Sequence, residues 1–212
     1  MRIQLALDLL DLDRALDVAE SAAPWVDILE AGTPLIKSAG MEAVRSLRRR
    51  FPGKIVLADM KTADVGDLEV AMAAEAGADA VTVLACAPRE TIAAAAREAQ
   101  KRGLMLVADL LGLEDDMAGR LALLSAFEVP MAEIHCGIDE QHVGKDPFER
   151  LRTVAAMTDL RLAVAGGLGP ANLSALPKVS RLEVVIVGGA ITRAADPGSV
   201  AREVAALLAK EG

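Results

Sequence analysis

The sequence predicts one α/β domain over residues 1–212, in which eight parallel strands close into a (β/α)8 (TIM) barrel. A short apolar run rich in β-formers is followed by a polar residue or glycine and then by a segment of helical period, and this unit recurs eight times. The length leaves about 26 residues per unit, enough for a strand, a loop and a helix. Strict alternation of strand and helix specifies a parallel sheet, and eight units are the number that closes one into a barrel.

Each apolar run of the repeat is a predicted strand. The eight runs are residues 3–7, 26–29, 55–58, 80–83, 104–108, 131–134, 162–165 and 184–187. Two helix starts carry local signals, because Asp196-Pro197 is a capping residue followed by proline, and Gly169-Pro170 predicts the start of the seventh helix in the same way. No low-complexity segment or linker interrupts the chain, so we expect a single domain.

A doubly wound dinucleotide-binding sheet is the competing architecture. It would carry its glycine-rich phosphate loop after the first strand, whereas here that strand ends in Asp8. The segment Gly167-Leu168-Gly169 resembles the start of such a loop, but it lacks the third glycine and follows the seventh strand. The pattern therefore favours the barrel.

Composition excludes several classes of partner. The chain has 31 acidic and 23 basic residues, a net charge of −8 and only 2% aromatic residues, which argues against nucleic acid binding. No apolar run approaches the roughly 20 residues needed to cross a bilayer, so we expect no membrane partner. Only two cysteines are present and no apolar leader follows Met1, which favours a cytoplasmic location.

Polar side chains follow most of the predicted strands. In a barrel the active site forms at the carboxyl ends of the strands, so these residues should meet at one mouth. Side-chain alternation also puts Asp59 and Lys61 on the same face of the third strand. The residues at the strand ends are Asp8, Glu30, Asp59, Lys61, Asp109 and His135.

Several unpaired carboxylates at one mouth of the barrel would repel one another, so we expect a cation or an anionic substrate to organise the polar cluster. Glu30 and Asp59 offer oxygen ligands only, which favours a hard ion, Mg²⁺ or alternatively Mn²⁺. His135 is a candidate general acid or base. Each residue also has a purely structural alternative, since Asp8 or Asp64 can cap a helix.

Two glycine pairs follow the last two strands. Gly166-Gly167 and Gly188-Gly189 let the backbone approach a ligand closely, and the loops after strands seven and eight are the usual phosphate site of barrels. We therefore predict a phosphorylated substrate held at Gly166, Gly167, Gly188 and Gly189.

The segment 59–64, Asp-Met-Lys-Thr-Ala-Asp, resembles the D-x-K-x-x-D signature of the orotidine 5′-monophosphate decarboxylase superfamily. Within that superfamily the chain is similar throughout to the 3-hexulose-6-phosphate synthase family. Stretches that carry this second resemblance are residues 4–8, 29–36, 78–84, 135–141, 164–167 and 188–191.

The resemblance implies an aldol addition of formaldehyde to D-ribulose 5-phosphate through an enediolate, giving D-arabino-hex-3-ulose 6-phosphate, or the reverse reaction. It implies Mg²⁺ and a homodimer in which Asp64 reaches the partner's site. Lys61 would stabilise the developing negative charge, His135 would transfer the proton and Asp64 would keep Lys61 charged. Asp8 and Asp109 would orient substrate hydroxyls.

Three alternatives remain open. The sister 3-keto-L-gulonate 6-phosphate decarboxylases usually carry arginines where Ile138 and Gly189 stand here. A Schiff-base aldolase would use Lys61 as a nucleophile with a lowered pKa, whereas neighbouring acids should raise that pKa. A non-catalytic barrel that binds sugar phosphates is the alternative outside the enzymes.

Overall fold

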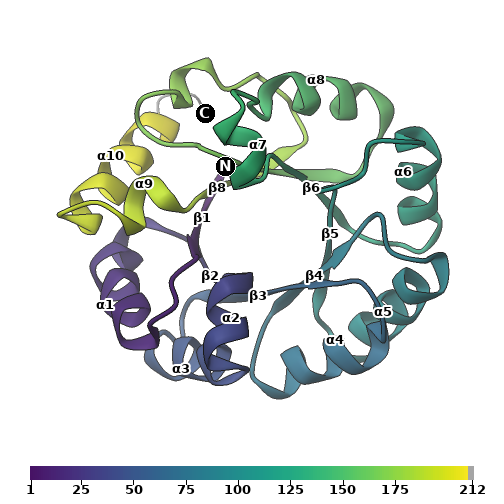
Figure 1. Cartoon of the computed structure of the whole chain (residues 1–212), viewed down its shortest axis with the longest axis horizontal. Coiled ribbons are helices and arrows are strands. Elements are labelled where there is room, and N and C mark those ends of the chain that lie inside the picture. The colour runs from purple at the N-terminus through teal and green to yellow at the C-terminus, as the bar shows by residue number, and fades with distance from the viewer. Residues whose placement is uncertain (210–212) are drawn as a thin grey trace.

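The computed structural model describes residues 1–209 and forms a closed parallel barrel in which the strands follow one another in chain order. Figure 1 looks along the barrel, with the strands in an inner ring and the helices around them. Each of the eight predicted runs overlaps a strand, so the fold prediction is confirmed. The strands are β1 (Arg2–Leu7), β2 (Ile28–Ala31), β3 (Ile55–Thr62), β4 (Ala80–Leu84), β5 (Met105–Asp109), β6 (Met131–His135), β7 (Arg161–Ala165) and β8 (Leu182–Val187).

Helices or helical turns occupy the connections between strands, and three connections carry two helices each. Asp196 begins α10 as predicted, since its side chain accepts from the Ser199 N–H at 2.9 Å. The helical elements are α1 (Leu12–Ala22), η1 (Ala23–Trp25), α2 (Thr33–Ala39), α3 (Glu42–Arg50), α4 (Gly66–Glu75), α5 (Arg89–Arg102), α6 (Met117–Ala126), α7 (Ile138–His142), α8 (Phe148–Met157), η2 (Leu173–Ala175), α9 (Gly189–Thr192) and α10 (Pro197–Ala209).

The predicted seventh helix is wrong. After β7 the chain forms only the 3-10 turn η2 before β8 begins. The Asn172 side chain accepts from the Gly169 N–H at 3.0 Å and donates to the Gly167 carbonyl at 3.0 Å, which closes a local turn instead of starting a helix. Pro177 follows two residues after η2 and supplies no N–H, so a helix cannot be extended through this segment.

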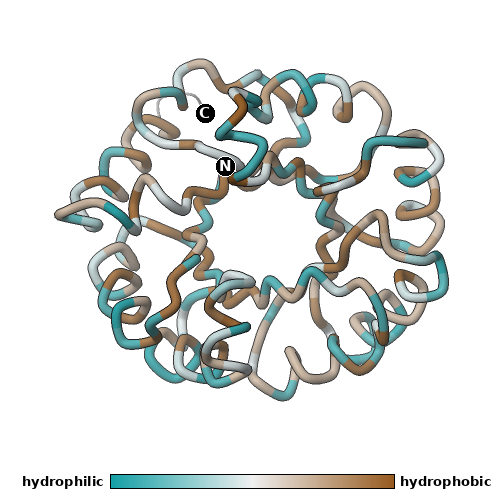
Figure 2. The backbone as a smooth tube through the Cα atoms, in the orientation of Figure 1, coloured by the Kyte–Doolittle hydropathy of each residue, from teal (hydrophilic) through white to brown (hydrophobic). Residues whose placement is uncertain are grey.

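Two apolar layers hold the barrel together. The larger layer lies between the strands and the surrounding helices, and it includes the fully buried Leu5, Leu29 and Val81. The smaller layer fills the barrel interior with side chains of opposite parity, such as Ala6, Ile28, Leu57, Met131 and Ile186. Figure 2 shows the hydrophobic colour concentrated on the strand ring. Several of the interior residues are alanines, and their small side chains leave space for the buried polar groups near the carboxyl ends of the strands.

No helix within residues 1–209 is long and apolar enough to cross a membrane.

Candidate active site

Lys61 lies at the centre of the polar cluster predicted at the strand ends. Its Nζ is 2.9 Å from Asp59 Oδ2 and 2.8 Å from Asp109 Oδ2, so one ammonium bridges carboxylates on β3 and β5. Asp59 and Asp109 are 4% and 0% exposed, which makes both ion pairs largely shielded from water. The structure thus brings Asp109 of β5 against two residues of β3, Asp59 and Lys61.

A β-bulge in β3 accompanies the ion pairs of Lys61. Simple alternation of side chains along a strand did not predict this bulge. Its pairing with β4 shifts register between Ala58 and Thr62, and Lys61 adopts a left-handed φ of 46°. The Lys61 N–H donates to Thr82 Oγ1 at 2.9 Å, which supports the strained residue. A left-handed non-glycine residue costs about 1 kcal/mol or more, and such strain concentrates at functional sites. The bulge turns the ammonium back over Asp59.

His135 is held by the same carboxylate. Its Nδ1 lies 3.0 Å from Asp109 Oδ2, while Asp109 Oδ1 accepts from the Leu111 N–H at 2.8 Å. Burial alone would raise the pKa of Asp109, but the hydrogen bond and charge of His135, with the charge of Lys61, lower it to about 2. An ionised carboxylate can only accept, so while this hydrogen bond is made Nδ1 carries the proton and Nε2 is the nitrogen left for acid-base work.

Lys61 stays protonated in this environment. Burial tends to lower its pKa, but Asp59, Asp109 and Glu133 outweigh burial and raise it above the ordinary value. A nucleophilic amine needs the opposite shift. The geometry therefore disfavours the Schiff-base alternative and suits Lys61 as a permanent cation.

The predicted metal ligands face the same interior. Glu30 is 7% exposed, and its Oε2 accepts from Gln4 Nε2 at 2.7 Å. Burial, then the charges of Asp59 and Asp8, raise the pKa of Glu30 well above its ordinary value. Buried carboxyls that repel one another in this way fit a hard divalent cation.

Asp59 has more hydrogen-bond partners than Glu30, the other predicted metal ligand. Its Oδ2 accepts from Thr33 Oγ1 at 2.7 Å and its Oδ1 accepts from Thr82 Oγ1 at 2.8 Å, in addition to the contacts with Lys61. A cation at this carboxylate would have to replace one of these donors. Glu30 consequently offers the freer oxygen.

Another group of three possible metal ligands comes together beside Lys61. The donor atoms of Asp109, Glu133 and His135 all lie within 4.8 Å of one another. The Lys61 ammonium already contacts Asp109 Oδ2 and supplies the positive charge there. We therefore keep Glu30 and Asp59 as the better candidates for a metal.

Asp8 lies at the rim of this cluster, exposed at the mouth. Partial burial and the charge of Asp59 raise its pKa, while Lys61 and His135 lower it, which puts Asp8 within electrostatic reach of all three. A Cβ at position 32 would collide with Asp8 Oδ1, so a larger residue there would displace this carboxylate. Asp109 lies deeper than Asp8, beneath Lys61 and His135.

The first of the two glycine pairs adopts a backbone conformation that favours glycine. Gly166 and Gly167 adopt φ values of 121° and 66°, and a Cβ on Gly166 would collide with the Cys136 backbone. A Cβ on Gly189 would collide with the guanidinium of Arg193, which therefore folds back over the Gly188-Gly189 loop from one turn later. Within residues 1–209 that guanidinium forms no ion pair, and the sequence analysis missed it.

Asp64 does not join the cluster of its own chain. It is exposed, and its Oδ1 accepts from the Val65 N–H at 2.8 Å. Lys61 is held by Asp59 and Asp109 instead, so any contact between Asp64 and a Lys61 ammonium would have to involve a second subunit. The predicted role of Asp64 remains a prediction.

Strand-end inspection also missed polar residues inside the strands. Glu133 on β6 and Thr82 on β4 are 5% and 1% exposed and face the barrel interior. A signal for Glu133 was present, because it is the charged residue of an apolar run and shares its parity with His135. Thr82 carried no comparable signal.

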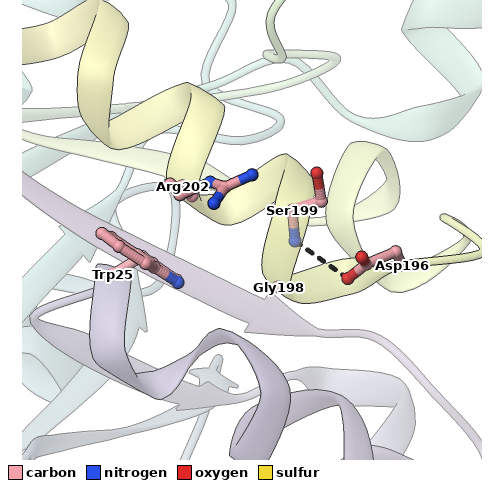
Figure 3. A pocket seen from close by; sticks show the side chains of 5 residues that line it. All are labelled: Trp25, Asp196, Gly198, Ser199 and Arg202. Carbon is pink, nitrogen blue, oxygen red and sulfur yellow. Dashed lines mark hydrogen bonds between the residues drawn. The ribbon is translucent and has the colours of Figure 1, made fainter.

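The shallow pocket of Figure 3 lies apart from this cluster, where Trp25 of η1 faces the start of α10. Its polar residues make the cap of α10, since Asp196 accepts from the Ser199 N–H there. No residue of the predicted site lines this pocket. It is a feature of helix packing.

Comparisons with known proteins match the whole chain. The 3-hexulose-6-phosphate synthase of Mycobacterium gastri is 43% identical over 211 residues, covering 99% of this chain and 100% of that protein. The crystal structure of 3-hexulose-6-phosphate synthase from Salmonella typhimurium is 37% identical, with a TM-score of 0.95 and coverage of 100% of both chains. The 3-keto-L-gulonate-6-phosphate decarboxylase structure from Vibrio cholerae is 30% identical, with a TM-score of 0.86 and coverage of 99% and 97%. A family profile matches residues 1–204, and the chain belongs to the Orotidine 5'-phosphate decarboxylase / HUMPS family.

Proposed function

We propose that this chain is an aldehyde-lyase that condenses formaldehyde with D-ribulose 5-phosphate to give D-arabino-hex-3-ulose 6-phosphate, or catalyses the reverse reaction. The observation that carries the proposal is the Asp109 carboxylate, which holds the Lys61 ammonium at 2.8 Å and His135 Nδ1 at 3.0 Å. This arrangement sets a cation and a proton-transfer group side by side. The similarity to full-length synthases supports the choice of substrate.

Proton transfer begins at the carbon beside the ketone. His135 Nε2 takes the C1 proton of the pentulose, and the resulting imidazolium is stabilised by the Asp109 carboxylate through Nδ1. Negative charge develops on the enediolate oxygens. Lys61 stabilises that charge as a fixed cation, because Asp59 and Asp109 keep it protonated and in place.

Carbon–carbon bond formation follows. The enediolate carbon attacks the carbonyl carbon of formaldehyde, the carbonyl π bond breaks, and the new alkoxide takes a proton that His135 returns. Asp8 at the rim is positioned to orient substrate hydroxyls. Mg²⁺, or Mn²⁺, held by Glu30 and Asp59 would supply further stabilisation of the enediolate charge.

The glycine pairs are the proposed phosphate site. Gly166 and Gly167 have positive φ values and Gly167 is exposed, while Gly188-Gly189 lies beneath the Arg193 guanidinium. Backbone amides and a guanidinium are both good donors to a phosphate dianion. A phosphorylated pentulose therefore fits better than a neutral sugar.

Homodimer formation and a cytoplasmic location are part of the proposal. Val65, Leu68 and Met72 are exposed at helical spacing on and beside α4, directly after Asp64. An apolar stripe of this kind suits a subunit interface. Both cysteines are free, which suits a reducing compartment.

The test compares two reactions of the native protein. We expect kcat/KM for formaldehyde with D-ribulose 5-phosphate to exceed that for decarboxylation of 3-keto-L-gulonate 6-phosphate, and excess EDTA to abolish both. Ile138 is exposed and lies three residues after His135. The Ile138→Arg variant should therefore place a cation near the reacting end of the sugar phosphate and bring the two kcat/KM values closer together. A native preference for the keto acid would favour the decarboxylase. Substrate binding without C1 proton exchange would favour a non-catalytic barrel.

A further inference from the structure

Glu133 is a buried acid beside the proposed site that the mechanism above does not use. It lies two residues before His135 on β6, and β5 pairs with β6 so that Asp109 and Glu133 are in register. The side chain faces the barrel interior and is almost completely buried. Its Oε1 lies 3.5 Å from His135 Nδ1. Both carboxyls therefore flank the same imidazole nitrogen.

The Asp109 carboxylate accepts from two other donors besides His135 Nδ1. Its Oδ1 accepts from the Leu111 N–H, and its Oδ2 is shared between Lys61 Nζ and His135 Nδ1. The charge on this oxygen is therefore divided between two donors, which weakens its interaction with each of them. A second acceptor near Nδ1 would therefore add to the restraint on the imidazole.

We propose that Glu133 is a positioning residue that provides this second acceptor and, with Asp109, holds His135 with Nδ1 protonated and Nε2 toward the mouth. The inference rests on the proposed function, in which the unprotonated Nε2 takes the C1 proton from the substrate. A distance of 3.5 Å is long for a hydrogen bond, so Glu133 is the weaker of the two carboxyl partners of Nδ1.

The chemistry of a buried acid agrees with this role. Burial, then the charges of Asp109 and Glu30, raise the pKa of Glu133 well above its ordinary value. A neutral carboxyl still has a carbonyl oxygen that accepts from an N–H. An apolar side chain would fill the interior at lower cost, so Glu133 is expensive unless it performs such a task.

Three variants separate the roles of acceptor, charge and volume. Glu133→Gln keeps an acceptor oxygen without ionisation, and Glu133→Met keeps the length but has no comparable acceptor. Met131→Leu is the matched control, because Met131 is also buried in the interior on β6. Thermal unfolding identifies any variant that has not folded.

The first readout is the tautomer of His135, measured from the ¹⁵N chemical shifts of histidine-labelled protein. The chain has two histidines, so a His142→Gln background leaves a single signal. We expect the Nδ1-protonated tautomer in native protein, Glu133→Gln and Met131→Leu, and a mixture of tautomers in Glu133→Met. A native Nε2-protonated tautomer, or an unchanged tautomer in Glu133→Met, would overturn the inference.

The second readout is exchange of the C1 proton of D-ribulose 5-phosphate. Glu133→Met should lower kcat about tenfold with KM within about twofold, because orientation is lost while binding is kept. Glu133→Gln should stay within about threefold of native. Equal loss in both variants would refute the acceptor role. If native protein shows no exchange, the proposed function fails, and the tautomer measurement still decides the role of Glu133.

Discussion

Lys61 illustrates how a single residue combines strain and charge. Its backbone is held in a left-handed conformation, and its ammonium lies between two buried carboxylates. The ion pairs offset the desolvation of Lys61, whereas Glu30 and Glu133 have no comparable cation and carry raised pKa values as a result of burial. The interior thus contains acids whose ionisation opposes folding.

The Glu133→Gln variant should be more stable than native protein at alkaline pH. A carboxyl with a raised folded-state pKa binds its proton more tightly when folded, so its contribution to stability is lost as pH rises above the unfolded value of about 4.5. Glutamine has no such dependence. We expect the Tm of the variant to exceed that of native protein by about 3 °C or more at pH 8 and to match it near pH 4.5. A variant that is less stable at pH 8 would contradict this account.

The segment that follows β8 places a side chain that sequence position alone did not reveal. Gly189 begins α9, a single turn that ends at Thr192, and the turn returns Arg193 to the space above Gly189. Because that space holds a guanidinium, the loop keeps a positive charge although its strand-end residues are glycines. The segment after β8 therefore lets a ligand approach its glycine backbone and places a positive charge beside that backbone.

Arg193→Ala should weaken phosphate binding without slowing chemistry. We expect KM for D-ribulose 5-phosphate and the inhibition constant for inorganic phosphate to rise about tenfold, with kcat within about threefold of native, since one charge-assisted contact is removed. Arg202→Ala is the control, because Arg202 is also exposed but lines the separate pocket of Figure 3. An unchanged inhibition constant would show that Arg193 does not contact the phosphate.

The whole molecule presents its proposed site residues at one mouth, except for Asp64. That residue lies at the outer end of β3 beside the exposed stripe of Val65, Leu68 and Met72. If this stripe packs against a second copy, Asp64 is carried toward the neighbouring barrel. The oligomer would then complete the cluster that a single chain leaves open.

Mixing two inactive variants tests this arrangement. Asp64→Asn and Lys61→Ala, combined and allowed to exchange subunits, should recover about a quarter of native activity, because half of the dimers then hold one intact site of two. A role for Asp64 within its own chain predicts no recovery. Each variant alone and a mixture of native protein with Lys61→Ala are the controls. Sedimentation must report dimers in every sample.

Much of the barrel follows from local patterns in the sequence. Strand positions depend on short apolar runs, and the parity of side chains within a strand is fixed by backbone geometry. Parallel strands end at one edge of the barrel, so the first polar residue after each run indicates the mouth. This reasoning predicts that Asp8, Glu30, Asp59, Lys61, Asp109 and His135 lie near one another at the mouth, and the structure brings them together there.

Features that depend on contacts between distant segments were decided by the tertiary structure alone. The Lys61 N–H at the bulge in β3 donates to Thr82 of β4, and the Lys61 ammonium is shared with Asp109 of β5. The choice of Asp59 and Asp109 as ion-pair partners of Lys61 likewise depends on the register of β3, β4 and β5. Local periodicity carries no information about such partners, because burial and hydrogen bonding are set by residues tens of positions away.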